Sequence, residues 1–397
     1  MSSMSMPEVG KRTALMTPIG VERMGDVADS LSNPEVLRLE NLDTDLLPPQ
    51  VALDTTREQV LDDDANSYLP FFGHDSLRKA ATALVERNGG LAAGTYNWKS
   101  QCFISAGGLS GILNALLAVI EPGDEVVMTS PTYVGLINRV LLAGGVPKYI
   151  PMKVVDGEWH LETDRIAEVV SSKTKAFLMM SPSMPSGATF NRYEWEAVCA
   201  ACVASNAWMI YDSAMERLLF LGAPKLNPLH FPGMKERTIT VGAASKEYRM
   251  IGWRVGWIVT PMGAAEALSR VALGNVVCTV GIAQKAVANA IEAEGDGIER
   301  CTREWQARHD YIVKVLRPNY DVVAAKGGWS LLVDVSKHGL TGAEASKRLL
   351  AEGVAATSME NWGLEGTKNY VRLVFANEPV LRLSTLEERF RRAIPPV

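Results

Sequence analysis

Short apolar segments alternate with helix-like segments from residue 102 onward, and this alternation constrains the fold more than any other feature of the chain. The segment at residues 176–180, Ala-Phe-Leu-Met-Met, is apolar throughout. A strand without polar alternation is typical of a parallel sheet that helices cover on both faces. We therefore predict an α/β fold with strands at residues 102–105, 125–129, 146–151, 176–180, 208–211, 238–241 and 257–259. In such a sheet, ligands bind beyond the carboxyl ends of the strands.

The chain has 397 residues, and single hydrophobic cores stop growing at roughly 250–300 residues. Strand patterns at residues 322–324, 329–334 and 370–375, with helical patterns between and after them, indicate a smaller α+β unit at the C-terminal end. We predict an N-terminal arm that joins part of the small domain (1–45), a large domain (46–299) and a small C-terminal domain (300–397). Within them we expect helices at residues 50–66 and 161–170 and a strand at 354–357.

Composition excludes several classes of function. The formal net charge of -5 gives no basic stripe for nucleic acid. No segment reaches the roughly 18 apolar residues of a membrane span, and the N-terminus has no signal-peptide core. Five cysteines, an odd number with the pair Cys199 and Cys202 in a helical segment, favour a reducing compartment, so we expect a cytoplasmic protein. The five histidines never approach metal-ligand spacing, so we predict no metal site.

One segment carries the strongest chemical signal. Ser245-Lys246 is followed, eight residues after the lysine, by an arginine in the run Gly252-Trp253-Arg254-Val255-Gly256-Trp257. A lysine becomes nucleophilic when burial and nearby positive charge lower its pKa, and it then condenses with a carbonyl group. The guanidinium of Arg254 matches a phosphate. Taken alone, such a pair is more often a surface lysine and a salt-bridged arginine. Candidate partners elsewhere in the chain must therefore show whether the pair belongs to a binding site.

Turns after other predicted strands offer those partners. Gly107, Gly108 and Leu109 open a helix whose free N–H groups suit a phosphate. Tyr133 follows the next strand and is able to stack on a heteroaromatic ring. Asp212 ends a strand, where its carboxylate would keep a pyridine nitrogen protonated. Arg372 interrupts an apolar strand and therefore needs an anionic partner.

This set of residues resembles the fold-type I pyridoxal-phosphate enzymes, specifically the class I/II aminotransferases, from about residue 37 to the C-terminus. The resemblance implies a large domain with a mainly parallel sheet flanked by helices, plus a smaller α+β domain. It also implies a Schiff base between Lys246 and pyridoxal 5′-phosphate, with Asp212 on the pyridine nitrogen and Tyr133 on the ring. The phosphate contacts would come from Gly107, Gly108, Leu109, Ser245 and Arg254. Arg372 would grip the substrate α-carboxylate, Trp329 would line the substrate pocket, and Tyr68 would reach the neighbouring site of a homodimer.

The chain departs from the family pattern around the cofactor's phenolic oxygen. Met184 stands where the family usually has asparagine, and Met215 where it usually has tyrosine. Those two polar residues normally hydrogen-bond that oxygen, whereas thioethers accept weakly and cannot donate. Nearby hydroxyls are alternative donors, from Ser181, Ser183, Ser186 or Ser213. A family hydroxyl is also replaced by Ala243, and the glycine of the N-terminal substrate loop appears as Asn41.

The resemblance implies an aminotransferase that moves an amino group between an α-amino acid and a 2-oxo acid through the Lys246 Schiff base. A lyase or a biosynthetic cyclase on the same fold is the alternative, because it would share every cofactor contact. The aminotransferase-like half of a transcription regulator is disfavoured, since the region before residue 37 is short and not basic. A dinucleotide-binding protein is disfavoured because no predicted strand is followed by G-x-G-x-x-G with an acid about 20 residues later. The substrate stays open: Trp329, Tyr68 and the methionines leave room for an aromatic or aliphatic side chain, and no second arginine is assigned to a side-chain carboxylate.

Overall fold

The computed structural model of the protein describes residues 8–293, 295 and 297–397. Its larger sheet has the strand order β2-β9-β8-β7-β6-β3-β4-β5. The pairs from β8 through β7, β6 and β3 to β4 are parallel, and the pairs at the two edges are antiparallel. The strands are β2 (Cys102–Ser105), β3 (Glu125–Ser130), β4 (Val146–Val155), β5 (Glu158–Leu161), β6 (Thr174–Met180), β7 (Trp208–Asp212), β8 (Thr238–Ala243) and β9 (Gly256–Val259).

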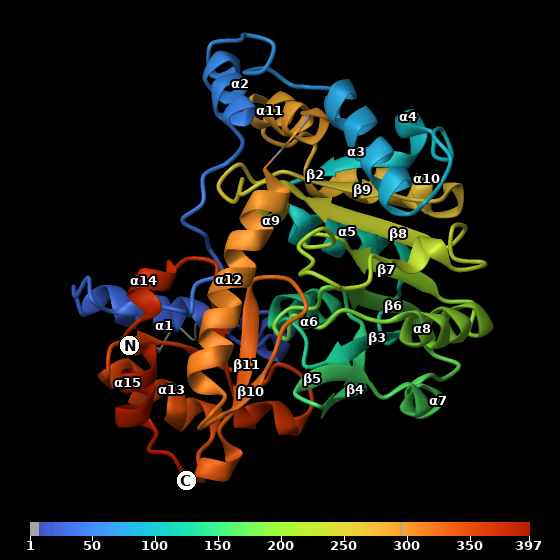
Figure 1. The fold of residues 1–397 in the computed structure, drawn as a ribbon. Helices are drawn as coiled ribbons and strands as arrows, with labels where there is room; N and C mark the ends of the chain where they lie inside the picture. The colour runs from blue at the N-terminus through green and yellow to red at the C-terminus, as the bar shows by residue number, and fades with distance from the viewer. Residues whose placement is uncertain (1–7, 294, 296) are drawn as a thin grey trace, which may run out of the picture.

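Helices cover this sheet, as the unbroken apolar strands predict (Figure 1). The helix α5 packs on β7, β8, β9 and β2, while α3 packs on β2 and β9. Covering both faces explains why every residue of β3 and β8 is buried. The helices of this part are α2 (Gln50–Val60), α3 (Asp75–Asn88), α4 (Trp98–Gln101), α5 (Gly108–Val119), α6 (Val134–Leu142), α7 (Ile166–Val169), α8 (Arg192–Ala204), α9 (Ala244–Glu247), α10 (Met262–Asn275) and α11 (Gly281–Glu292).

A smaller antiparallel sheet has the strand order β10-β11-β14-β13. Beside it, β1 near the N-terminus pairs in parallel with β12, so the chain's beginning packs with its C-terminal third. The strands are β1 (Leu37–Arg38), β10 (Asp321–Val323), β11 (Ser330–Asp334), β12 (Val354–Ala355), β13 (Thr357–Ser358) and β14 (Tyr370–Val374). The helices are α1 (Val21–Ser30), α12 (Ile298–Leu316), α13 (Gly342–Ala351), α14 (Val380–Leu383) and α15 (Leu386–Ala393).

The two sheets share one hydrophobic core. A cluster of buried residues continues from Phe177 on β6 through Trp305 on α12 to Trp329 and Phe375 beside the smaller sheet. Figure 1 shows α12, in orange, running from the region of α9 down past β11 and β10. The core therefore fixes the smaller sheet against the carboxyl ends of the larger sheet's strands. No helix among the described residues is long and apolar enough to cross a membrane.

Three expected elements are wrong in detail. Residues 161–170 form the end of β5, a 3₁₀ turn at Thr163–Arg165 and the short α7, because Leu161 pairs with Met152 of β4 and its N–H donates to Glu194 Oε1 (2.8 Å). Helix α2 ends at Val60, whose carbonyl accepts from the Asn66 side chain.

The expected strand at 354–357 is two strands. β12 pairs with β1, whereas β13 pairs with β14. In residues 161–170 the outcome depends on pairing with β4 and on the bond to Glu194, and in residues 354–358 on pairing with β1 and β14. Local propensity does not register such pairing.

Candidate active site

A cavity of about 460 Å³ lies where the carboxyl ends of β6 and β7 meet the start of α5, the smaller sheet and the N-terminal segment. It brings together eleven of the fourteen residues predicted for the site. These are Asn41, Gly108, Leu109, Tyr133, Met184, Asp212, Met215, Ser245, Lys246, Arg254 and Arg372. The position agrees with the rule that open α/β sheets bind ligands beyond their strand carboxyl ends.

Lys246 lies on the short helix α9, directly after β8, and is half-buried in this cavity. Its Nζ donates to the Leu42 carbonyl (2.8 Å) and lies 4.8 Å from the centroid of the Trp329 ring. Burial lowers the pKa of Lys246 to about 7, an effect that Asp43 opposes and Arg372 reinforces. A large fraction of the amine is therefore neutral near pH 7, as a nucleophile requires.

Asp212 is the last residue of β7 and is buried. Its Oδ1 accepts a hydrogen bond from the backbone N–H of Ala214 (3.0 Å). Burial raises the pKa of Asp212 to about 6, although the Ala214 bond and the charge of Lys246 oppose the rise. A cationic ring nitrogen at this carboxylate would favour its ionised form.

A cradle for a phosphate lies at the start of α5. Gly107, the N-cap residue, has a φ of +84° and caps the helix without a side-chain bond. A Cβ at Gly107 would stand 2.7 Å from Arg254 Nη2, so only glycine allows this approach. Arg254 Nη1 donates to the Ile251 carbonyl (2.7 Å) and to Ser245 Oγ (3.3 Å). No described carboxylate pairs with Arg254, so its remaining donors and the helix N–H groups of α5 suit a phosphate.

Tyr133 lies at the N-terminus of α6 and lines the cavity. Its ring lies directly over Gly135, where a Cβ would stand 2.4 Å from the ring. Trp362 is its aromatic neighbour, with ring centroids 5.6 Å apart. The ring is therefore held in place at the cavity wall, as a stacking residue requires.

Arg372 on β14 is fully buried. Its Nη2 donates to the Glu40 carbonyl (2.5 Å) and to Thr357 Oγ1 (3.4 Å), and Nη1 donates to Met184 Sδ (3.5 Å). The Nε atom has no partner among the described residues, and burial lowers the pKa of Arg372 to about 10. A guanidinium with unused donors in a cavity is a binding site for an anion such as a carboxylate.

Three predicted residues lie outside the cavity lining. Gly107 is behind Arg254, and Trp329 is buried beneath Lys246. Tyr68, on the connection between α2 and α3, is 81% exposed and does not contribute to the cavity of its own chain.

Sequence reasoning missed several cavity residues. Met180 ends β6 and was detectable from the strand-end rule that identified Asp212. Leu42 acts through its carbonyl, so its side chain gives no signal. Ile19 and Val21 reach the cavity because the side chain of Asn138 holds the nearby Thr17 backbone. The Thr17 N–H donates to Asn138 Oδ1, and Asn138 Nδ2 donates to the Thr17 carbonyl. That contact spans 121 positions and leaves no local pattern.

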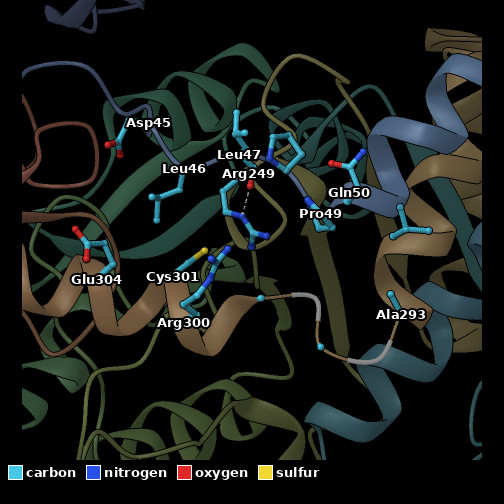
Figure 2. Close-up of a pocket in the computed structure, with 14 residues that line it drawn as sticks. Asp45, Leu46, Leu47, Pro49, Gln50, Arg249, Ala293, Arg300, Cys301 and Glu304 are labelled. Atoms are coloured by element: carbon cyan, nitrogen blue, oxygen red, sulfur yellow. Dashed lines mark hydrogen bonds between the residues drawn. The ribbon is translucent and has the colours of Figure 1, made fainter.

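A larger cleft, of about 710 Å³, lies on the other side of the N-terminal segment. Figure 2 shows residues 45–50 along one side and Arg300, Cys301 and Glu304 of α12 along the other, with Arg249 between them. Arg249 Nε donates to the Leu47 carbonyl (3.1 Å). No predicted site residue lines this cleft. Within the described part of the chain, no three His, Cys, Asp or Glu side chains are grouped to hold a metal ion.

Comparisons with known proteins agree with this geometry. The chain is 28% identical over 351 residues to an arginine–pyruvate transaminase of Pseudomonas aeruginosa, covering 87% of each chain. It is 29% identical over 321 residues to human kynurenine–oxoglutarate transaminase 3, covering 77% of this chain and 70% of that protein. Among solved structures, the aspartate aminotransferase from Thermus thermophilus with maleate superposes with a TM-score of 0.88 at 26% identity, covering 98% of this chain and all of that one.

These relatives are named as transaminases, so the comparisons do not favour a lyase or a cyclase. The family model described as aminotransferase class I and II matches residues 35–386. The chain therefore belongs to the class I and II aminotransferases, which depend on pyridoxal phosphate and share this fold.

Proposed function

We propose that this aminotransferase holds pyridoxal 5′-phosphate through Lys246 and acts on α-amino acids with apolar or aromatic side chains. The enzyme class follows from the family and from relatives named as transaminases. The residue roles and the substrate class rest on the cavity's chemistry. These roles are supported by one cavity that joins a half-buried lysine of low pKa, a buried carboxylate and two arginines. Neither arginine pairs with a carboxylate among the described residues.

The residues present fit the cofactor. Arg254, Ser245 and the N-terminus of α5 would bind the phosphate, and the absence of a side chain at Gly107 leaves the approach open. Asp212 would pair with the ring nitrogen, and Tyr133 would lie on the ring. When bound, the cofactor supplies an electron sink for the charge left at the substrate Cα.

Lys246 is the proposed base that removes the Cα proton. Its amine has the required pKa, because burial holds it at about 7, where a general base works most efficiently. The Leu42 carbonyl would hold the amine at the cavity floor between proton transfers. Arg372 would bind the substrate α-carboxylate through Nε, which has no described partner, and through Nη1, which would exchange the Met184 sulfur for the carboxylate.

The remaining cavity wall is apolar and favours a neutral substrate side chain. Among the lining side chains that the structure describes, the cations are Lys246, Arg254 and Arg372, and each already has a role. Most of the other lining residues are apolar, namely Ile19, Val21, Leu42, Leu109 and Ile251, and Asn41 adds an uncharged amide. A second carboxylate on the substrate would lose its solvation without gaining a partner in this chain.

A substrate panel tests the proposal. Each amino acid is mixed with the enzyme, with and without a 2-oxo acid, while the cofactor spectrum is recorded. Conversion of the cofactor to its amine form in one equivalent supports transamination, and leucine, methionine and phenylalanine should exceed aspartate and glutamate. Ammonia release without a 2-oxo acid would refute it, and preference for acidic substrates would refute the substrate class.

A homodimer is the proposed assembly. Tyr68 and Phe71 are exposed, as are Val277 and Val280. The two segments lie together, since a Cβ at Gly281 would stand 2.2 Å from the Ala65 carbonyl. Exposed apolar side chains on two adjoining segments support an interface through which Tyr68 reaches the neighbouring cavity.

Mixing two inactive variants tests this assembly. If Tyr68 acts across subunits, hybrids of Lys246→Ala and Tyr68→Ala chains contain one intact site and regain activity. If Tyr68 acts within its own chain, mixing restores nothing. Light scattering of the wild-type protein should give the mass of two chains.

We also propose that the enzyme works in the cytoplasm. No disulfide joins any of the five cysteines, and four of them are buried, which suits a reducing compartment. Fractionation of the source cells tests this placement.

A further inference from the structure

Three methionines form one wall of the active-site cavity. Met180 ends β6, Met184 follows it in the next loop, and Met215 follows β7. All three line the cavity and are otherwise buried, with 9%, 4% and 2% exposure. A thioether accepts hydrogen bonds weakly and donates none. This methionine wall therefore presents a soft, apolar surface without side-chain donors.

The neighbouring hydroxyls do not change this property. Ser181 Oγ accepts from the Phe190 N–H (3.2 Å), and Ser186 Oγ accepts from the Ala188 N–H (3.2 Å). Ser213 Oγ donates to the Val241 carbonyl (3.2 Å). Neither these three nor Ser183 is among the described residues that line the cavity. The cavity lining therefore gives no support to the expectation that a nearby serine replaces the missing donors.

The methionine wall faces a definite part of the cofactor if the proposed function is correct. Asp212 then marks the ring nitrogen, Lys246 the aldehyde and Arg254 the phosphate. In pyridoxal phosphate, the phenolic oxygen lies beside the aldehyde, on the side away from the phosphate arm. Since Asp212, Lys246 and Arg254 account for the ring nitrogen, the aldehyde and the phosphate, the methionine wall is the part of the cavity that remains for the phenolic oxygen.

We propose that Met180, Met184 and Met215 form a donor-free wall beside the phenolic oxygen and thereby keep the Lys246 Schiff base protonated to higher pH than a wall with donors would. The inference rests on the proposed function and extends it to the acid–base behaviour of the resting enzyme. It makes the three methionines positioning residues for a proton.

The direction of the pKa shift follows from the charges on the Schiff-base nitrogen and the phenolic oxygen. The Schiff-base proton lies beside an anionic oxygen, so an opposite charge holds it in place. Hydrogen-bond donors to the phenolic oxygen would delocalise its negative charge and so weaken its attraction for the Schiff-base proton. Loss of the proton would leave the anion against thioethers, without any partner, which is costly in an apolar environment. Both effects raise the pKa of the Schiff base.

Other charged and titratable groups also face the lysine. Asp43 and Asp212 favour a charged amine, whereas Arg372 and Arg254 disfavour it. Tyr133 lines the same cavity. A test must therefore change the methionine wall and leave these five groups in place; the Met215 pair does so most directly, because Arg372 Nη1 donates to Met184 Sδ (3.5 Å).

Matched substitutions provide that test. Met215→Tyr adds a hydroxyl that Met215→Phe lacks, and Met184→Asn adds an amide that Met184→Leu lacks. The cofactor-loaded proteins are titrated with base while the visible absorbance of the protonated Schiff base is followed. A hydrogen bond to a charged group corresponds to about one pKa unit or more. Each donor variant should therefore titrate about one unit below its partner, and Met180→Leu should titrate like the wild type.

The outcomes separate the two proposals. Equal midpoints for each matched pair overturn the inference, as does a wild-type midpoint below about pH 7. Because the two positions lie in different segments, one pair suffices if a variant of the other fails to fold. If neither donor variant holds cofactor, the wild-type midpoint decides. A wild-type protein that gives no Schiff-base absorbance at any pH instead refutes the proposed function.

Discussion

Two buried arginines, which contact opposite ends of the segment at residues 40–51, explain why we propose the smaller of two cavities, and not the larger, as the active site. Arg372 Nη2 donates to the Glu40 carbonyl, and Arg249 Nε donates to the Leu47 carbonyl. Arg372 faces the smaller cavity and keeps Nε without a described partner. Arg249 faces the larger cleft of Figure 2, and its Nη1 is also bonded, to the Glu247 carbonyl (2.7 Å).

The difference teaches that unused bonding capacity identifies a site better than size does. The acids of the larger cleft are engaged as well, since Asp45 and Glu304 both pair with the buried Arg308. In the smaller cavity, burial lowers the pKa of Lys246 to about 7 and raises that of Asp212 to about 6. Buried groups that the protein leaves in unfavourable states are typical of functional sites. The larger cleft fits a structural role, in which Arg249 and Arg308 anchor the N-terminal segment.

The largest expected effect is in the smaller cavity. Lys246→Ala removes both the proposed cofactor bond and the proposed base, so steady-state turnover should fall by at least about 10⁴-fold. Turnover is measured with the preferred amino acid of the panel, and circular dichroism serves as the check on folding. Full turnover by a folded Lys246→Ala protein would remove the basis for the site.

The two arginines give the next prediction. Arg372→Ala should cost roughly 2–5 kcal/mol in kcat/KM for the amino acid, because the substrate carboxylate loses a buried cationic partner. Most of the loss should appear in KM. Arg249→Ala is the matched comparison, and its kcat/KM should stay within about threefold of the wild type. Similar losses for both variants would contradict the distinction between the two hollows.

The rate at which the protein binds pyridoxal phosphate should depend on pH through Lys246 in the smaller cavity, and residues of the larger cleft should not affect this dependence. The neutral amine of Lys246 is the reactive form, so the rate at which the cofactor-free protein captures pyridoxal phosphate should rise as the amine loses its proton. With a pKa of about 7, this rise is about tenfold between pH 6 and pH 8, followed by a plateau. Stopped-flow absorbance measures the rate. A rate that continues to climb toward pH 10 would show an ordinary lysine.

The smallest effect concerns stability. Arg249→Ala leaves the Leu47 and Glu247 carbonyls without their guanidinium donors, which should lower the free energy of unfolding by about 1–3 kcal/mol. Part of this loss is offset in Arg249→Gly, because Arg249 has a φ of +56° that glycine adopts without strain. Urea unfolding with activity measured in parallel checks the order wild type, Arg249→Gly, Arg249→Ala. An unchanged midpoint for both variants would show that Arg249 does not anchor the segment.

Much of the cavity was predictable because its residues follow strands or open helices. Asp212 ends β7, Gly107 precedes α5 and Gly108 opens it, and Lys246 follows β8. Parallel strands bring their carboxyl ends to one edge of a sheet, so a local signal at each strand end becomes a shared site. Residues that reach the cavity by other routes, such as Ile19 and Val21, carried no such signal.

The sequence by itself determined the alternation of strands and helices, the lysine–arginine signature and the absence of the usual polar residues at Met184 and Met215. Each of these is written in neighbouring residues or in residue chemistry. Only the tertiary structure decided that the nearby serines are not part of the cavity lining, that Leu42 offers its carbonyl to Lys246, and that Nε of Arg372 has no described partner whereas Nε of Arg249 donates to Leu47. The Leu42–Lys246 and Glu40–Arg372 bonds join residues 204 and 332 positions apart, and folding alone brings those segments together.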